Sequence, residues 1–417
     1  MKKFIFVLFF IFLYLNVLFG QKPMPIYAFP GPASPGGNYT TLVNANVVSG
    51  PVIEFGWNTI DTDGVPADFS WTAHDARINN FLNTYAGSTI IVQYAPASDL
   101  FTNSFTPSYV WQANGMYMCQ CPQYAGSGTY PNNGTSCDTN PPDGTGVPVP
   151  FAAPMITYWS QFIQQAILHD QGLANASKIK RIIFGRNRGG EDYPTCYPQE
   201  QTIISPPQTL AHLLTLWQGM DATYDGVIYN NNIGTNKFQI VSGVACIGNA
   251  QYDPTGANNC SFADGIAATH IQYNVGLRFT SIVGSDINNY AGNAPTAADW
   301  VALSLKYPNA AIDLQYGVEA GPTGTCNAKS VPLNQIQPFL NIIERQNSNV
   351  ILEATLNDLY GTYVAGFLGG PDTCWPNGTS TPYQPYAQIN SNTLLGLPYS
   401  TLLLTGKQKL SGNSVSH

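Results

Sequence analysis

Eight short runs of β-branched and aromatic residues, separated by longer segments of helical period, constrain the fold of this chain most. Most of these runs are apolar on both faces, as strands are when a parallel sheet is covered on both sides. Strands that alternate with helices predict a parallel sheet with crossover connections, and eight such units predict an α/β fold of the (β/α)8 TIM barrel type. The expected strands are Pro25–Phe29, Pro51–Trp57, Thr89–Tyr94, Arg181–Gly185, Phe238–Val244, Leu277–Val283, Ala311–Tyr316 and Val350–Thr355.

Apolar residues recur every three or four positions between the runs, as in Trp159, Ile163 and Ile167 or in Leu210, Leu213 and Trp217. This period predicts helices whose apolar faces pack on the sheet. His74, His169 and His212 fall on such helices, where we expect them to cap or pack, without a catalytic role.

One connection is much longer than the others. More than fifty residues rich in Gly, Pro, Asn and Tyr, with three cysteines, separate the third strand from a helix that starts near Pro154. Long barrel loops are usually functional, so this insertion either walls a cleft, with Trp111 as a stacking ring, or is a disulfide-pinned surface feature. Residues beyond about Gly369 are expected to extend the same domain.

The N-terminus has the pattern of a secretory signal. Lys2 and Lys3 precede an apolar run from Phe4 to Phe19 and then Gly20. We expect residues 1–20 to be removed, which leaves one domain over residues 21–417 of a secreted protein. An uncleaved anchor is the alternative, but the run is shorter than the ~20 residues that a spanning helix needs.

The surface is expected to be neutral and polar, because charged residues make up 10% of the chain against a usual ~25%. Without Lys2 and Lys3, 14 basic residues stand against 24 acidic ones, a net charge of about −10. This balance argues against nucleic acids and anionic membranes as partners and favours neutral polar ligands such as carbohydrates. A monomer is the simplest expectation.

The chain has eight cysteines, an even number that predicts disulfides in a secreted protein. No C-x-x-C or His-x-x-x-His pattern occurs, so no metal site is expected. Loop proximity suggests the pairs Cys246–Cys260 and Cys326–Cys374, with the others around the active face: Cys119, Cys121, Cys137 and Cys196. Glycosylation sequons occur at Asn38, Asn133, Asn175, Asn259 and Asn377.

Two of the six glutamates, Glu191 and Glu319, follow the fourth and seventh expected strands. The carboxyl ends of barrel strands converge on one face, so these two carboxyls can meet across its mouth. Cleavage of a glycosidic bond needs a general acid and a second carboxylate near the anomeric carbon. We therefore predict Glu191 as acid/base and Glu319 as nucleophile, with Arg186 and Arg188 turned away from Glu191 or bound to Asp192.

Other residues near the strand ends are candidates for substrate contact. Glu54 and Glu353 are expected to point into the barrel, as partners of Arg278 or as hydrogen-bonding groups for substrate, and Glu353 is the rival nucleophile. Aromatic rings there either stack on sugar rings or simply pack, namely Trp57, Tyr94, Tyr193, Tyr316 and Trp375.

With these motifs the chain resembles the large superfamily of barrel glycosidases that includes cellulases and β-galactosidases. Glu54-Phe-Gly-Trp-Asn followed by Asp68-Phe-Ser-Trp is similar to the second-strand segment of the β-galactosidases. The resemblance implies an acid/base after strand 4 and a nucleophile after strand 7, although Gly190 stands where that superfamily has Asn. The Gly-Glu-x-x-Pro spacing around Glu191 is more similar to β-amylases, which invert configuration and would make Glu319 a base.

The sequence thus predicts a secreted glycoside hydrolase of the retaining type, with an inverting enzyme or a non-catalytic carbohydrate-binding or matrix barrel as alternatives. No nucleophile elbow, Walker loop, dinucleotide fingerprint or His-Glu-x-x-His motif is present, so no cofactor is expected.

Overall fold

The computed structural model describes residues 24–29, 35–44, 48–62, 66, 68–97, 105–119, 137–138, 146–186, 210–244, 261–282, 295–316, 343, 346–347 and 349–354. The expected signal segment and C-terminal extension lie outside this part of the chain. Among the described residues, no helix is both long enough and apolar enough to cross a membrane.

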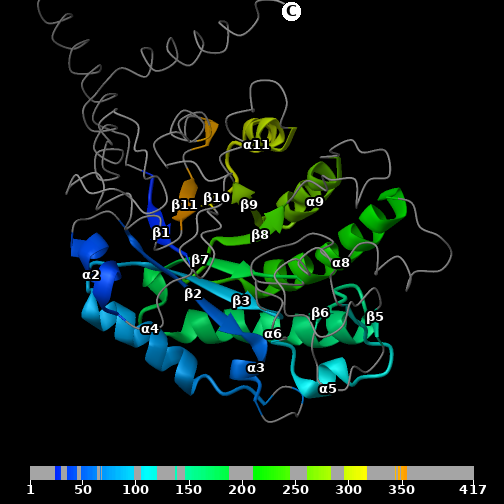
Figure 1. The fold of residues 1–417 in the computed structure, drawn as a ribbon, viewed down its shortest axis with the longest axis horizontal. Helices are drawn as coiled ribbons and strands as arrows, with labels where there is room; N and C mark the ends of the chain where they lie inside the picture. The colour runs from blue at the N-terminus through cyan, green and yellow to red at the C-terminus, as the bar shows by residue number, and fades with distance from the viewer. Residues whose placement is uncertain are drawn as a thin grey trace, which may run out of the picture.

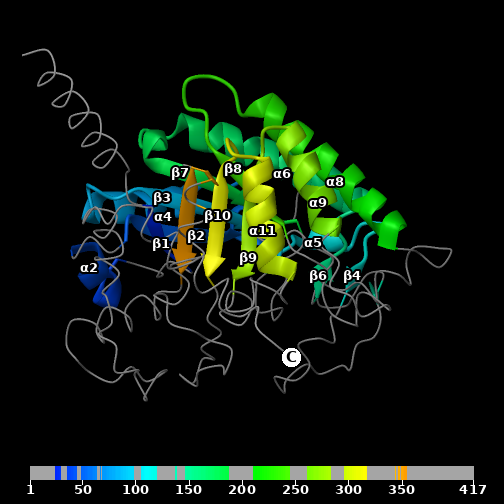
Figure 2. The ribbon, with the colours of Figure 1, turned by 90° about the horizontal axis from the view of Figure 1, so that it is seen from above.

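Eight parallel strands form a closed barrel, which confirms the predicted fold class (Figures 1 and 2). Neighbouring strands are consecutive along the barrel wall, and β1 closes it by pairing with both the second and the last strand. The strands are β1 (Ile26–Ala28), β2 (Gly50–Gly56), β3 (Ile90–Ala95), β7 (Ile179–Phe184), β8 (Ile240–Val244), β9 (Gly276–Ile282), β10 (Ile312–Tyr316) and β11 (Val350–Ala354). The fourth and seventh barrel strands are therefore β7 and β10.

Helices cover the outside of the barrel, and α6, α8 and α9 lie side by side there (Figure 1). The apolar stripes predicted from the sequence face the sheet, since Trp159, Ile163 and Trp217 are fully buried. The helices are α2 (Gly37–Asn44), α3 (Trp57–Ile60), α4 (Thr72–Thr84), α5 (Ser108–Trp111), α6 (Ala153–Gly172), the short 3-10 helix η2 (Ala176–Lys178), α8 (Leu210–Asn231), α9 (Ser261–Gln272) and α11 (Pro295–Lys306).

The long insertion after β3 contains regular structure that the sequence did not predict. Three two-residue strands, β4 (Met118–Cys119), β5 (Cys137–Asp138) and β6 (Val147–Pro148), form an antiparallel sheet in the order β5-β4-β6. Met118 and Val147 are buried in the core that α6 also joins, so this sheet is packed against the barrel's helical layer. Cys119 lies opposite Cys137 in the register of β4 and β5.

Two glycines allow strands to pass close to neighbouring backbone. A Cβ atom on Gly50 in β2 would lie 1.6 Å from the Thr89 carbonyl oxygen, and one on Gly276 in β9 would lie 2.4 Å from the Ala311 carbonyl oxygen. Neither position has room for a side chain, so the absence of a Cβ is what lets the wall close there.

Candidate active site

The inside of the barrel is filled in layers. Apolar side chains form one interior cluster, which comprises Tyr27, Phe29, Val52, Ile91, Ile183, Val241 and Ile351. Side chains alternate along a strand, so polar residues in phase with this cluster also point inward. These are Glu54, Gln93, Arg181, Asp313, Gln315 and Glu353.

Arg278 and Glu353 form a buried ion pair inside the barrel. Arg278 Nε donates to Glu353 Oε1 at 3.1 Å and its Nη2 donates to Oε2 at 2.7 Å. The guanidinium also lies 5.2 Å from the centre of the Phe29 ring. Both side chains are fully buried. The two-pronged contact uses both carboxylate oxygens, so Glu353 is the counterion of Arg278, as one of its expected roles has it, and its part in substrate contact or as rival nucleophile stays a prediction.

A second buried ion pair lies nearer the N-terminal ends of the strands. Arg181 Nε donates to Asp313 Oδ1 at 2.9 Å, and its Nη2 donates to Asn349 Oδ1 at 2.8 Å, just before β11 begins. Burial raises the pKa of Asp313 to about 6, although Arg181 acts in the opposite direction. This pair links β7 to β10 across the barrel axis.

Glu54 is the partly exposed acid of the barrel interior among the described residues. Gln93 Nε2 donates a hydrogen bond to Glu54 Oε2, which joins β2 to β3. Three other buried oxygens inside the barrel, Gln93 Oε1, Asp313 Oδ2 and Gln315 Oε1, have no hydrogen-bond partner within the described residues. Buried acceptors of this kind normally bind water or a ligand.

Phe105 lies at the rim of the barrel, a position that the sequence reasoning missed. A Cβ on Gly56 would lie 2.6 Å from the Phe105 ring, so the ring rests on the end of β2. Two backbone hydrogen bonds hold it there, from Phe105 N to Pro96 O at 2.9 Å and from Asn58 N to Phe105 O at 2.7 Å. The side chain stays half-buried. A half-buried aromatic ring beside polar groups can stack its face on a sugar ring.

Two of the predicted stacking rings are placed elsewhere. Trp57 begins α3 and is fully buried, with its ring 5.0 Å from that of Trp159. Tyr94 is out of phase with Gln93 and lies behind the barrel wall, where its hydroxyl donates to Asp170 Oδ2 at 2.8 Å. Neither ring has a free face, so the prediction of substrate contact is corrected for both, and the packing alternative holds.

Trp111, at the end of α5, is half-buried against the core, so its stacking role stays a prediction. The side chain of Tyr316 and all of Glu191, Glu319, Tyr193 and Trp375 lie outside the described residues. Arg186 follows β7 and is buried away from the barrel interior, where it contacts Asp221 at 3.3 Å and Asp225 at 2.6 Å on α8. Because Glu191 lies outside the described residues, the expectation that Arg186 turns away from it stays a prediction.

A hollow of about 390 Å³ opens where β8, β9 and β10 begin. Its lining includes Lys306, Tyr307 and Asn349. In (β/α)8 enzymes the chemistry occurs at the opposite end, where the strands finish, so this hollow is not the candidate active site.

No family model and no curated protein matches this sequence. Among solved structures, the chain is similar to the catalytic domain of a β-amylase from Paenibacillus polymyxa, with a TM-score of 0.57 and 11% identity over 91% of this chain and 100% of that one. Xylanase B from Clostridium stercorarium F9 matches at a TM-score of 0.39 and 11% identity, over 80% of this chain and 85% of that one. A glucosidase from Croceicoccus marinus matches at a TM-score of 0.41 and 12% identity, over 89% of this chain and 66% of that one. The chain has the (β/α)8 fold, in an arrangement similar to that of a β-amylase catalytic domain.

Proposed function

We propose that the protein is a secreted glycoside hydrolase that cleaves O-glycosidic bonds in a neutral oligo- or polysaccharide. The observation that carries the proposal is the position of Glu191 and Glu319 after β7 and β10, the fourth and seventh strands of a closed barrel. Glu191 follows the end of β7 by seven residues and Glu319 follows the end of β10 by three, so the chain allows both to reach the end where the strands finish. Glu191 is assigned as general acid/base and Glu319 as nucleophile.

The surroundings of this end of the barrel support a carbohydrate substrate. Glu54 and Gln93 supply polar groups, and the half-buried Phe105 ring supplies an apolar surface beside them. Arg186 is neutralised by Asp221 and Asp225 behind the wall. We therefore expect Arg186 to have little effect on the pKa of Glu191, which must keep its proton to act as an acid.

An inverting mechanism is the second candidate, and a specific observation favours it. The loop around Glu191 resembles that of β-amylases, and the fold is similar to a β-amylase catalytic domain. In this version Glu191 remains the acid, while Glu319 activates a water molecule instead of attacking the sugar.

Activity on a panel of starch, xylan, cellulose and galactan oligosaccharides tests the proposal. Glu191→Gln and Glu319→Gln should each lower kcat by about 10²–10⁴-fold, because each removes a group that transfers a proton or stabilises the transition state. Glu344→Gln, beside Arg345 on an expected outward helix face, is the matched control and should retain full activity. Sugar binding without hydrolysis by the wild type would instead support the non-catalytic carbohydrate-binding or matrix barrel.

The anomeric configuration of the first product, followed by NMR, distinguishes the two mechanisms. Retention supports Glu319 as nucleophile, and azide should then restore activity to Glu319→Ala with formation of a glycosyl azide. Inversion assigns Glu319 as the base.

Secretion and covalent modification belong to the same proposal. N-terminal sequencing of the protein from the medium of a eukaryotic host should start at Gln21, if residues 1–20 are a signal peptide. Cys119 and Cys137 are opposed on antiparallel strands, a Cα separation that a disulfide accommodates. Asn175 is half-exposed beside η2, where a glycan could be attached. Non-reducing peptide mapping tests the bridge and the glycan, and light scattering tests the expected monomer.

A further inference from the structure

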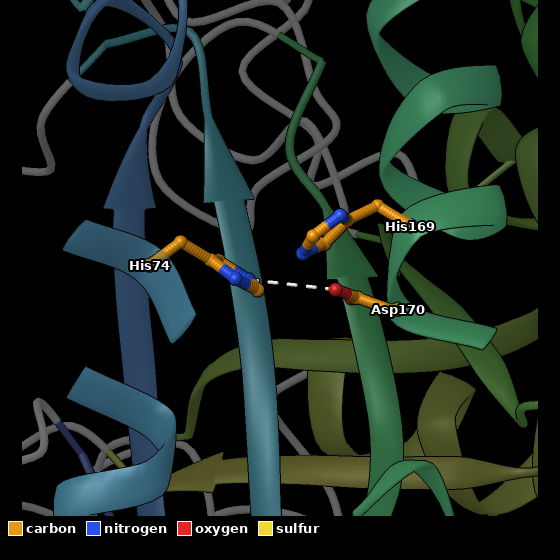
Figure 3. Close-up of side chains that lie close together, drawn as sticks. All are labelled: His74, His169 and Asp170. Carbon is orange, nitrogen blue, oxygen red and sulfur yellow. Dashed lines mark ion pairs between the residues drawn. The ribbon is translucent and has the colours of Figure 1, made fainter. Parts of the chain in front are cut away.

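Three metal-ligating side chains meet outside the barrel, between α4, α6 and β3. His74 lies in the first turn of α4, and His169 and Asp170 lie in the last turn of α6. One ligand atom from each residue lies within 4.8 Å of the other two (Figure 3). His74 Nε2 is 3.5 Å from Asp170 Oδ1, the contact drawn as a dashed line.

A fourth residue, Asp75, holds the histidines in orientation. Its Oδ1 lies 3.0 Å from His74 Nδ1 and 2.8 Å from His169 Nε2. With Nδ1 of His74 held by this carboxylate, Nε2 lies 2.8 Å from the Tyr94 hydroxyl and faces Asp170. Histidines that bind metals are usually fixed in this way, by a carboxylate on the nitrogen that does not bind.

Asp170 is the group in this cluster that most lacks a partner. The side chain is fully buried, and Tyr94 donates to its Oδ2 at 2.8 Å. Its Oδ1 is buried without a hydrogen-bond partner within the described residues. A metal ion bound there would give this buried oxygen the partner that it lacks.

We propose that His74, His169 and Asp170 bind a divalent transition metal ion, with Zn²⁺ as the best match. Two imidazole nitrogens and one carboxylate oxygen are donors that Zn²⁺ prefers. Bonds of ~2.1 Å to a tetrahedral ion place donors ~3.4 Å apart, so the widest separation, up to 4.8 Å, has to shorten by up to about 1.4 Å. The side chain of His169 keeps 21% exposure and that of Asp75 keeps 34%, which gives an ion a route of entry.

This ion would be structural rather than catalytic. It would link the start of α4 to the end of α6, behind the wall of β3 and away from the barrel mouth. The site therefore stands independently of the glycosidase proposal. No sequence motif predicts this site, because its ligands come from two helices far apart in the chain and lack the close spacing of a metal-binding motif.

Titration of the full-length, EDTA-treated protein with Zn²⁺, followed by calorimetry, tests the proposal. The wild type should bind one equivalent. Asp75→Asn should weaken binding by about 10–100-fold, the range for loss of a supporting carboxylate, and His169→Ala should weaken it by at least about 100-fold. His212→Ala removes an exposed histidine on α8 and should leave affinity unchanged.

Thermal unfolding gives a second readout. Zn²⁺ should raise the Tm of the wild type and of His212→Ala but not that of His169→Ala. The proposal is overturned if the wild type binds no Zn²⁺ in the cluster, or if His169→Ala binds as tightly as the wild type. Should His169→Ala fail to fold by circular dichroism, Asp75→Asn decides alone, and unchanged affinity in that variant rejects the site.

Discussion

At the residue scale, the Arg278 and Glu353 pair makes the barrel interior sensitive to single substitutions. Removing one member of a buried pair leaves the other charge unpaired, at a cost of about 3–5 kcal/mol. We predict that Arg278→Met lowers the free energy of unfolding by this amount, measured by urea denaturation. The double variant Arg278→Met/Glu353→Leu should recover much of the loss. A double variant as unstable as the single one would show that packing, not the unpaired charge, is responsible.

Asp313 gives a pH dependence of known sign. Its pKa is raised to about 6 in the fold, whereas an unfolded Asp titrates near ~3.9. Between these values the folded state holds more protons, so stability falls as pH rises from about 4 to about 6, by at most about 3 kcal/mol.

The comparison with Asp313→Asn isolates this contribution. The stability of the wild type minus that of the variant should decrease across this pH range and level off above it. A difference that increases with pH would mean that Arg181 holds Asp313 ionised and lowers its pKa.

The sequence predicts which residues lie near the strand ends better than it predicts where their side chains point. The pairing of Glu353 with Arg278 followed from two opposite charges on runs that are otherwise apolar. Tyr94 was misplaced because β3 is apolar on both faces, which hides the alternation that sends Gln93 inward and Tyr94 outward. Phe105 was not predicted because it lies in a loop that returns to β2, and a loop contact of this kind leaves no periodic pattern in the sequence.

At the element scale, replacing a glycine should have opposite effects in the barrel wall and in a helix. Gly50→Ala would place a Cβ 1.6 Å from the Thr89 carbonyl oxygen, so it should lower the free energy of unfolding by several kcal/mol or prevent folding. Gly219→Ala in α8 meets nothing within 4 Å and should raise it by about 0.5–1 kcal/mol. Chemical denaturation of both variants checks this contrast, and equal effects would contradict the close approach at β2.

The strands were the most predictable elements. All eight expected ranges overlap the observed ones, because short runs that are apolar on both faces fit a covered parallel sheet. The small sheet β4–β6 was not predicted, since two-residue strands are too short to show a period.

At the scale of the whole molecule, the barrel depends on its first strand. β1 pairs with β2 and β11, and its side chains enter both the interior cluster and the outer core. A chain that lacks residues 1–34 should therefore show no cooperative thermal unfolding, whereas one that lacks only residues 1–20 should unfold cooperatively. Differential scanning calorimetry makes the comparison, and a sharp transition in the shorter chain would show that closure is dispensable.

The side chains that fill the barrel interior prevent any ligand from passing along the barrel axis. Within the described residues, the barrel interior is packed with side chains and contains no open channel. Its filling includes Tyr27, Val52 and Ile183, and the Arg181 and Asp313 pair lies nearer the N-terminal ends of the strands. A long polymer cannot thread along the axis from one end to the other. If the proposed substrate is a polymer, it has to lie across the end where the strands finish, so substrate would enter and products would leave on the same side of the barrel.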